Sequence, residues 1–226
     1  MATRQEFIDL VAPIAVKLRM DGSPIYPSVR IAQAILETGG KVNAWNNLVG
    51  YKVGSGILTP YWQGDRVSAV TWEVIDGTRV DNVPGDFRAY SSIESGFRDQ
   101  DLFFQTVRYT GVRAASDPGE QTSALQNSGY ATDPAYAAKL NAIIQANNLT
   151  RYDEEVTNML EELQAQLTAL QNRVAALEGQ MALEAIPQWA EAAVNAAVKA
   201  GMIDTPSHGS YDFYRLLTVL YRKGIV

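Results

Sequence analysis

Apolar residues recur at alternating intervals of four and three between residues 156 and 181. The a positions of this heptad array hold Leu160, Leu167, Val174 and Met181, and the d positions hold Val156, Leu163, Leu170 and Leu177. This spacing is typical of a coiled coil, in which each helix buries one stripe against a partner helix. We predict a homo-oligomer, a trimer or a dimer, through residues 156–181. The alternative is one long amphipathic helix that packs back on the rest of the chain.

The heptad array divides the 226-residue chain into three predicted parts. Residues 1–150 are expected to form a globular domain, residues 151–183 a coiled-coil stalk, and residues 184–226 a short helical module. Hydrophobic residues make up 46% of the sequence and charged residues 19%, so the flanking parts can bury cores and disorder is not expected.

Cysteine is absent and histidine nearly so, which limits the kinds of catalytic and metal-binding sites that the chain can form. The chain has no cysteine and a single histidine, His208. Disulfide scaffolds, thiolate zinc sites, cysteine nucleophiles and multi-histidine metal sites are therefore excluded, and a serine–histidine triad is disfavoured. We predict neither a metal nor a cofactor. The formal net charge is −6 and there is no basic run, which argues against nucleic acid as a partner.

The amino terminus starts like a helix rather than a leader. It lacks a basic region followed by an uninterrupted apolar stretch and a small-residue cleavage site, so we predict no signal peptide. No segment approaches 18 consecutive apolar residues, so we also predict no membrane span.

Residues 1–150 carry start and stop signals for several helices. A hydroxyl side chain three residues before a glutamate, or an acid followed by proline, marks a helix start. These signals occur at Thr3 with Glu6, at Ser91 with Glu94, at Asp117-Pro118 and at Asp133-Pro134. Gly39 and Gly40 are expected to end the helix that begins near Ser28, because glycine accepts the left-handed C-cap conformation.

One stretch of the same region predicts β-structure. Residues 67–90 alternate around Asp76-Gly77, which is typical of a hairpin with a two-residue turn. The expected fold class is therefore mainly α (α+β): a helical domain with a small β-hairpin lobe, followed by the coiled-coil helix and the short helical module.

Two carboxylates stand out as candidate acid–base groups. Glu37 ends an otherwise apolar helix turn, where apolar neighbours and the negative end of the helix dipole both raise its pKa, as a general acid near neutral pH requires. Alternation places Glu73 with Thr71 and Ile75 on one face of the hairpin, from which it could overhang a cleft. The alternative for each is a solvated surface glutamate.

Aromatic side chains are frequent in the predicted loops and helix ends of residues 1–150. Sugar rings stack on such faces, so a glycan site is one interpretation and core packing is the other. The candidates are Trp45, Tyr51, Tyr61, Trp62, Tyr90, Tyr109, Tyr130 and Tyr136. Asn46 and Asn47 can hydrogen-bond sugar hydroxyls or amides, although an asparagine pair also makes turns.

Six segments within residues 5–149 together resemble one family. In chain order they are FIDLVAPIAV, PSVRIAQAILETGG, NNLVGYK, DFRAYSSIESGFRD, RYTGV and ALQNSGYATDPAYAAKLNAII. In these segments the chain resembles the bacterial endo-β-N-acetylglucosaminidases of glycoside hydrolase family 73, which include flagellar, autolysin and phage-lysin domains. The resemblance implies a lysozyme-like domain whose cleft binds peptidoglycan and hydrolyses the β-1,4 bond between N-acetylglucosamine and N-acetylmuramic acid.

The resemblance also implies roles for individual residues. Glu37, in AILETGG, corresponds to the general acid, and Glu73, just before the hairpin turn, matches the second acid best. Tyr130, in GYATDP, corresponds to the tyrosine thought to support the reacting sugar, and Tyr136 and Asn47 correspond to cleft positions.

The predicted substrate-binding residues are Trp45, Asn47, Tyr51, Tyr109 and Tyr136. Directly after the catalytic helix this chain departs from the family: it reads ETGGKVN where the family usually reads ESGWGKS. The tryptophan is absent and the loop is shortened, and Trp45 is the candidate replacement for sugar stacking.

Residues 186–226 predict two helices separated by a glycine and a loop. The run WAEAAVNAAVKAGMI and the later LLTVLYR resemble a single surface-layer homology repeat, a module that binds secondary polymers of Gram-positive walls. Residues 210–213 replace the threonine-arginine-alanine-glutamate signature that usually opens the second helix, and a small stability or assembly cap is the alternative. Because such repeats commonly occur in threes, a trimeric coiled coil would bring three copies together and raise avidity.

Together these features predict a peptidoglycan hydrolase that acts at the bacterial cell wall as a phage or prophage endolysin or a virion-associated lysin. The alternative is a non-catalytic glycan-binding or structural component of a phage tail or cell-surface assembly. A lytic transglycosylase, which needs only one glutamate, is a third interpretation. A carboxylate separation of roughly 6.5–9.5 Å would indicate inversion and about 5–5.5 Å retention, and the substrate's acetamido group is a further candidate nucleophile.

Overall fold

The computed structural model describes residues 3–75 and 78–226, and the side chains of all of these except 71–82 and 180. The chain divides into two compact units, Met1–Leu160 and Glu161–Val226. The boundary between them falls inside one long helix, further along the chain than residue 150, where the sequence alone predicted the end of the first domain.

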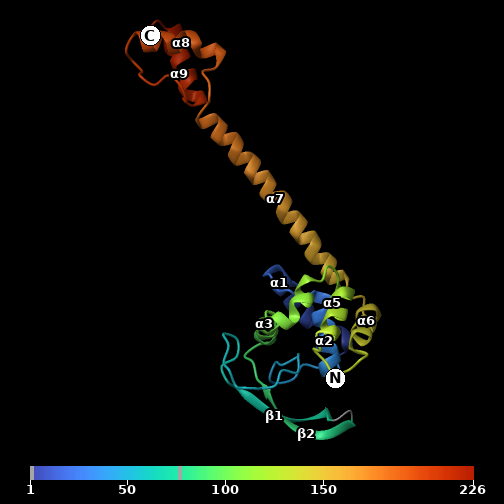
Figure 1. Cartoon of the computed structure of the whole chain (residues 1–226). Coiled ribbons are helices and arrows are strands. Elements are labelled where there is room, and N and C mark those ends of the chain that lie inside the picture. Colours follow the sequence, from blue (N-terminus) through green and yellow to red (C-terminus); the bar gives the residue numbers. More distant parts are fainter. Residues whose placement is uncertain (1–2, 76–77) are drawn as a thin grey trace. The chain divides into compact units, whose positions relative to one another are not determined.

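Helices make up most of the first unit (Figure 1). In chain order they are α1 (Arg4–Met20), α2 (Pro27–Thr38), α3 (Ile93–Phe104), α4 (Thr110–Ala114), α5 (Pro118–Asn127) and α6 (Tyr136–Ala146), with a 3-10 turn at Val107–Tyr109 before α4. α2 packs against α1, α5 and α6, and every residue from its start to Ile35 is buried. A single apolar core, to which all six helices contribute, therefore holds α2 in place up to its last turn.

Several predicted helix ends are confirmed. Thr3 and Glu6 form the expected capping box on α1, with 2.6 Å between the Thr3 nitrogen and Glu6 Oε2. Asp117 caps α5 by accepting from the backbone nitrogen of Glu120 at 2.8 Å. Gly39 ends α2 with a φ of +66°, the left-handed conformation expected of a glycine C-cap.

Two predicted helix starts are wrong in detail. α3 is capped by Ser92 rather than Ser91, because the Ser92 hydroxyl accepts a backbone N–H of the first turn at 3.1 Å. Asp133 does not open α6 directly. It accepts from the backbone nitrogen of Ala135 at 2.9 Å and makes a turn, and the helix begins only at Tyr136. In both cases the predicted residue type can cap a helix, but the conformation of the local backbone determines where the helix begins.

A two-stranded antiparallel hairpin forms the β lobe of the first unit (Figure 1). β1 (Arg66–Ile75) pairs with β2 (Thr78–Arg88) along their length. The predicted turn residues Asp76 and Gly77 lie outside the described residues. The predicted fold class, mainly helical with a small antiparallel lobe, is confirmed.

Two buried polar side chains fasten the base of the hairpin to the helical lobe. Asp99 on α3 accepts from Arg88 Nη1 and from the Tyr90 hydroxyl, each at 2.7 Å, and from a threonine hydroxyl. Asn47 donates to the carbonyls of Arg88 (2.9 Å) and Tyr51 (2.8 Å) and accepts from the Tyr51 nitrogen (3.0 Å). The backbone of residues 51–53 also pairs with the end of β2: the Val53 nitrogen donates to the Asp86 carbonyl and the Arg88 nitrogen donates to the Tyr51 carbonyl, each at 2.9 Å. The two side chains and these backbone bonds together fix the base of the hairpin.

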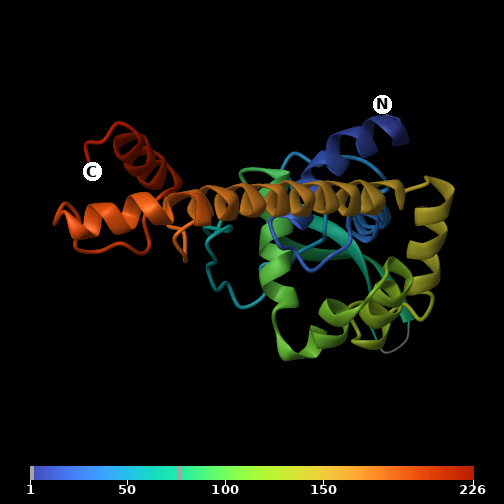
Figure 2. The same cartoon turned by 90° about the horizontal axis from the view of Figure 1, so that it is seen from above.

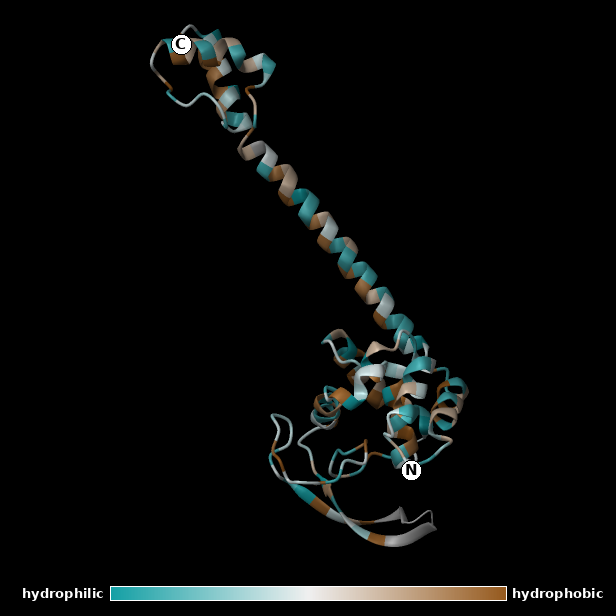
Figure 3. Cartoon of the chain, viewed as in Figure 1, coloured by the Kyte–Doolittle hydropathy of each residue, from teal (hydrophilic) through white to brown (hydrophobic). Residues whose placement is uncertain are grey.

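α7 (Arg151–Met181) begins in the first unit and continues into the second. Val156, the first predicted heptad position, is only 4% exposed. The later heptad side chains are much more exposed, at 50% for Leu160, 48% for Leu167, 51% for Val174 and 74% for Met181. Apolar segments recur along α7 in Figure 3. Neither α7 nor any other helix of the described residues is long and apolar enough to cross a membrane.

The second unit ends in a short helical module. α8 (Glu191–Lys199) follows a 3-10 turn at Gln188–Ala190 and packs against α9 (Tyr211–Arg222) (Figure 1 and Figure 2). Their shared core consists of Ala190, Ala193, Val194, Ala197, Tyr214 and Leu217. The predicted order of helix, glycine, loop and helix is therefore present.

Candidate active site

α2 positions Glu37 at the edge of the helical lobe. The buried part of the helix ends at Ile35, and Glu37 lies in its last turn. Gly39 and Gly40 both follow with positive φ angles, +66° and +77°, which only glycine adopts at little cost. The chain therefore turns away directly after Glu37 and leaves its side chain at the start of an open loop.

A cavity of about 630 Å³ opens beside Glu37. Its wall combines the end of α2, the loop that follows, the start of α6, and Ala69, Val70 and Phe87 from the hairpin. This volume lies within the range of ligand-binding clefts. The helical lobe and the β lobe thus enclose one site, and Glu37 belongs to its wall.

The Glu37 carboxyl faces the cavity and is also desolvated. Its side chain is exposed on the open side, while protein surrounds it on the others, and this burial raises its pKa to about 7. Gly50 approaches so closely that a Cβ there would lie 3.1 Å from Glu37 Oε2. A carboxyl that keeps its proton near neutral pH can give it to a leaving oxygen.

The charge on Glu37 acts on Tyr130 and Tyr136, but Tyr130 is not among the residues that line the cavity. Burial is the main cause of the raised pKa of both phenols, and the charge on Glu37 adds to it. Tyr136 lines the cavity, and its hydroxyl accepts from Gln33 Nε2 at 3.0 Å. The Tyr130 hydroxyl accepts from Gln100 Nε2 at 2.9 Å. Both side chains therefore act as neutral hydroxyls rather than as phenolates.

The other predicted substrate-binding residues occupy different surroundings. Trp45 lines the cavity and is partly exposed, so its ring is accessible to a ligand. Asn47 also borders the cavity, but its amide makes the hydrogen bonds that hold the hairpin. Tyr51 and Tyr109 do not line the cavity; their rings pack against Phe103 with centroids 5.4 and 4.8 Å away. Sugar binding by these four residues stays a prediction.

Glu73 lies on β1, with its Cα opposite Val80 of β2. The register shifts between Thr71 and Glu73, which indicates a β-bulge and interrupts the alternation from which its face was predicted. The side chain of Glu73 is outside the described residues, so its assignment as the second acid stays a prediction.

The cavity is also lined by charged residues that were not predicted from the sequence as site residues. Asp133, expected only as a helix cap, lines the cavity and pairs with Lys139 at 2.5 Å. Lys41 and Lys52 line it as well. Lys41 directly follows the glycines after Glu37, so its position could have been inferred from the sequence. Within the described part of the chain, no group of three or more histidine, aspartate or glutamate side chains could hold a metal ion.

Comparison with known proteins identifies the family of the domain around this cavity. A model of the glucosaminidase family, described as mannosyl-glycoprotein endo-beta-N-acetylglucosaminidase, matches residues 13–149. The chain belongs to this family. The glucosaminidase match includes Glu37, Tyr130 and Tyr136, and it leaves α7 and the carboxy-terminal module outside.

Curated relatives align with about two thirds of the glucosaminidase chain. Exo-glucosaminidase LytG of Bacillus subtilis is 35% identical over 161 residues, which cover 67% of this chain and 54% of LytG. Peptidoglycan hydrolase FlgJ of Pseudomonas aeruginosa is 36% identical over 152 residues, which cover 63% of this chain and 36% of FlgJ. The aligned part thus spans roughly a third to a half of the length of these relatives.

Solved structures share the glucosaminidase fold. A peptidoglycan hydrolase mutant from Sphingomonas sp. A1 has a TM-score of 0.56 at 34% identity and covers 67% of this chain and 99% of its own. The catalytic domain of the autolysin Auto from Listeria monocytogenes has a TM-score of 0.54 at 30% identity, covering 67% of this chain and 90% of its own. The resemblance seen in the sequence is therefore confirmed for the family and its lysozyme-like fold, while the coiled coil and the wall-binding module stay predictions.

Proposed function

We propose that this chain is a peptidoglycan hydrolase that cleaves the β-1,4 bond between N-acetylglucosamine and N-acetylmuramic acid and leaves N-acetylglucosamine at the reducing end. The observation that carries the proposal is the Glu37 carboxyl, which faces a cavity of about 630 Å³ and has a pKa of about 7. Membership of the glucosaminidase family supports the reaction class. Relatives named peptidoglycan hydrolase support the cell-wall substrate.

In the proposed mechanism, Glu37 starts protonated and gives its proton to the glycosidic oxygen as the bond to the sugar breaks. Desolvation favours the neutral acid in the free enzyme. The positive charge that develops on the sugar then favours the carboxylate that remains. Trp45, which lines the same cavity, offers a ring face for stacking a sugar.

The second step needs a group that activates water or stabilises the sugar cation. We assign this role to Glu73 on β1, and the acetamido group of the substrate is the alternative nucleophile. Tyr130 supports the reacting sugar in this scheme. Its raised pKa and that of Tyr136 favour hydrogen bonding by neutral hydroxyls over attack by a phenolate.

We also propose that the chain self-associates in parallel through α7. The half-exposed heptad side chains support this, because a second copy supplies a complementary stripe. Arg173 and Glu178 flank the stripe at g and e positions, five residues apart, and parallel coiled coils pair these positions between chains. A dimer or trimer of this kind would present several copies of residues 184–226, which raises avidity for a secondary wall polymer.

The biological setting we propose is the bacterial cell wall, with the chain acting as a phage or prophage endolysin or a virion-associated lysin. A non-catalytic glycan-binding or structural component of a tail or surface assembly is the second candidate. The observation that favours it is the sequence ETGG at the end of α2, where the resemblance led us to expect ESGW.

Mass spectrometry of the fragments released from purified peptidoglycan tests the function. We expect wild type to release fragments with N-acetylglucosamine at the reducing end. Folded Glu37→Gln should release them about 10²–10⁴-fold more slowly. The control variant Glu161→Gln, which changes an exposed glutamate of α7, should behave as wild type. Anhydro ends would instead identify a lytic transglycosylase, and N-acetylmuramic acid ends a muramidase. No fragments from any wall type would overturn the hydrolase and favour the binding component.

A further inference from the structure

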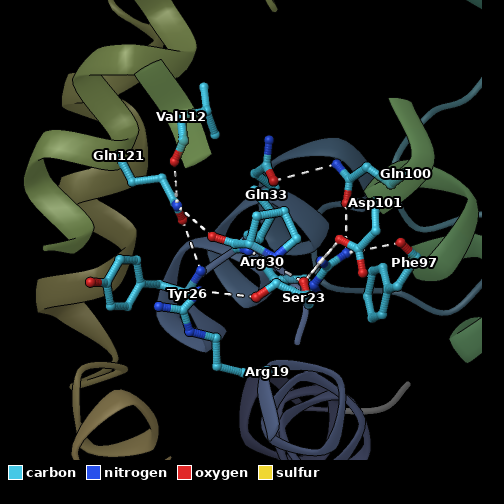
Figure 4. Close-up of polar contacts among 12 residues, drawn as sticks. Arg19, Ser23, Tyr26, Arg30, Gln33, Phe97, Gln100, Asp101, Val112 and Gln121 are labelled. Carbon is cyan, nitrogen blue, oxygen red and sulfur yellow. Dashed lines mark hydrogen bonds and ion pairs between the residues drawn. The ribbon is translucent and has the colours of Figure 1, made fainter. Parts of the chain in front are cut away.

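A connected set of buried polar side chains contacts the hydroxyls of Tyr130 and Tyr136. Arg30 and Gln33 on α2 are 0% and 1% exposed, and Gln100 on α3 is 0% exposed (Figure 4). None of the three lines the cavity. Burying a guanidinium and two amides costs free energy unless each is hydrogen-bonded. The hydrogen-bond partners of these side chains therefore indicate how the side chains are oriented.

Arg30 fixes the orientation of the Gln100 amide. Its guanidinium pairs with Asp101 and donates to Ser23 Oγ at 2.8 Å, to the Phe97 carbonyl at 3.2 Å and to Gln100 Oε1 at 2.9 Å (Figure 4). A guanidinium has donors only, so the oxygen of the Gln100 amide must face Arg30. The amide nitrogen of Gln100 therefore points the other way.

The orientation of Gln100 sets that of Gln33. Gln100 Nε2 donates to the Tyr130 hydroxyl at 2.9 Å and to Gln33 Oε1 at 3.4 Å. With its oxygen turned toward Gln100, Gln33 presents Nε2 to the Tyr136 hydroxyl at 3.0 Å. Each tyrosine oxygen thus accepts from an amide N–H, and each keeps its own proton for another acceptor.

Of the two tyrosines, Tyr136 is among the described residues that line the cavity and Tyr130 is not. Tyr136 shares the cavity wall with Glu37, and the charge on Glu37 acts on both phenols. A hydroxyl that donates toward a carboxylate stabilises its charged form. The other charged side chains that line this cavity are Lys41, Lys52, Asp133 and Lys139.

We propose that Arg30, Gln100 and Gln33 form a relay that directs the hydroxyl proton of Tyr136 toward the cavity, where it stabilises the carboxylate of Glu37. The carboxylate is the form left after the acid has given up its proton. The three relay residues are positioning residues, because they act through Tyr136 and do not line the cavity. The inference rests on the proposed role of Glu37 as the general acid.

The relay is tested by following the titration of the Glu37 carboxyl with carbon-13 NMR in the full chain. In Gln100→Met we expect the titration midpoint of Glu37 to rise by about half a pH unit or more, because the carboxylate loses a directed donor. The same variant should lose about tenfold in kcat for fragment release with little change in KM, as expected of a group that acts after binding.

Gln121→Met is the matched control. Gln121 is also 0% exposed, but its partners are the nitrogen of Tyr26 and the carbonyls of Pro24 and Val112, and not a tyrosine hydroxyl (Figure 4). This variant should lose stability without moving the titration of Glu37. An equal shift in both variants would mean that general loosening of the domain, and not the relay, controls Glu37.

A double-mutant cycle separates positioning from structural damage. If Gln33 acts through the Tyr136 hydroxyl, Gln33→Met should add nothing to the effect of Tyr136→Phe on the Glu37 midpoint. Additive effects, or an unchanged midpoint in folded Gln100→Met, would overturn the relay. If Gln100→Met does not fold, the Gln33 cycle decides. If wild type releases no fragments, the proposed function is overturned but the relay is not, because the NMR titration of Glu37 does not depend on activity.

Discussion

Asp153, in the first turn of α7, accepts a hydrogen bond from the backbone nitrogen of Ser28 in α2 at 3.0 Å. The N-cap residue of α2, Tyr26, makes no side-chain cap, and Pro27 has no N–H, so Ser28 carries the first free donor of the helix. A carboxylate from a distant part of the chain thus caps the helix that carries Glu37. This contact joins the start of α7 to α2.

The cap predicts different results for two substitutions of Asp153. Asp153→Ala should lower the free energy of unfolding by about 1 kcal/mol, because the helix loses its acceptor. Asp153→Asn keeps an acceptor and removes a charge that burial disfavours, so it should be close to neutral near pH 7. Chemical denaturation of the full chain measures both. A larger loss for asparagine than for alanine would contradict the cap.

The difference in stability between wild type and Asp153→Asn should depend on pH in a definite direction. Burial raises the pKa of Asp153 above its unfolded value. The stability of wild type relative to Asp153→Asn should therefore be greatest below the unfolded pKa, about 3.9, and should fall as the pH rises through the higher folded pKa. Thermal unfolding of both proteins at several pH values on either side of this range checks the sign.

Glu37 should control the alkaline limb of the pH–activity profile. The general acid must be protonated, and burial raises its pKa to about 7, so kcat/KM should fall about tenfold per pH unit well above pH 7. Glu37→Gln should lower kcat by about 10²–10⁴-fold and abolish this limb in any residual activity. An alkaline limb that persists unchanged in the glutamine variant would assign it to another group.

Gly50 and Gly54 form a matched pair for testing the wall beside Glu37. Both have positive φ angles, +68° and +57°, so alanine at either position should cost about 1–2 kcal/mol in backbone strain. A Cβ at Gly50 would lie 3.1 Å from Glu37 Oε2, whereas one at Gly54 meets nothing within 4 Å. Gly50→Ala alone should therefore displace the carboxyl and lower kcat, by about tenfold or more. Similar kcat values for the two variants, with similar melting temperatures, would exclude this contact as a constraint on the acid.

The heptad stripe of α7 should control self-association. Leu167 is an a position and 48% exposed in the single chain, and the adjacent Thr168 lies outside the stripe. Leu167→Asp should convert a dimer or trimer to monomer in sedimentation equilibrium, because a coiled-coil interface does not accept a buried charge. Thr168→Asp adds the same charge and should leave the oligomer intact. If wild type has the mass of a monomer at every concentration, self-association through the stripe is excluded.

The helices around the site were predictable where a few neighbouring residues determine the backbone. Gly39 ends α2 as expected, because a left-handed residue after an apolar helix is a local property. Asp117 caps α5 for the same kind of reason. Ser92 and Ala135, by contrast, differ from the predicted caps, since adjacent polar residues compete for the same helix start and only the assembled backbone chooses between them.

The candidate site was predictable from the sequence only in part, and its spatial arrangement was not. Glu37 stands out because the same helix turn that carries it is apolar. Asn47 was expected to meet a sugar or make a turn, and its amide holds the base of the hairpin, a role that depends on Arg88 lying beside it in space. Arg30 and Gln100 gave no local signal, because their connection to Tyr130 joins residues that are far apart in the chain.

Asn47 and Asp99 hold only the base of the β1–β2 hairpin, so a small rotation there is amplified toward its far end. Glu73 lies seven residues along β1 from Arg66, which at about 3.3 Å per residue is roughly 23 Å from the base of the hairpin. By the same measure, a rotation of about 3° at the base moves the backbone of Glu73 by about 1 Å. Misplacement on that scale is enough to cost a catalytic group much of its effect. Under the proposed role of Glu73 as the second acid, substitutions at Asp99 or Arg88 should therefore change catalysis by moving the hairpin, without altering a residue proposed to bind the sugar.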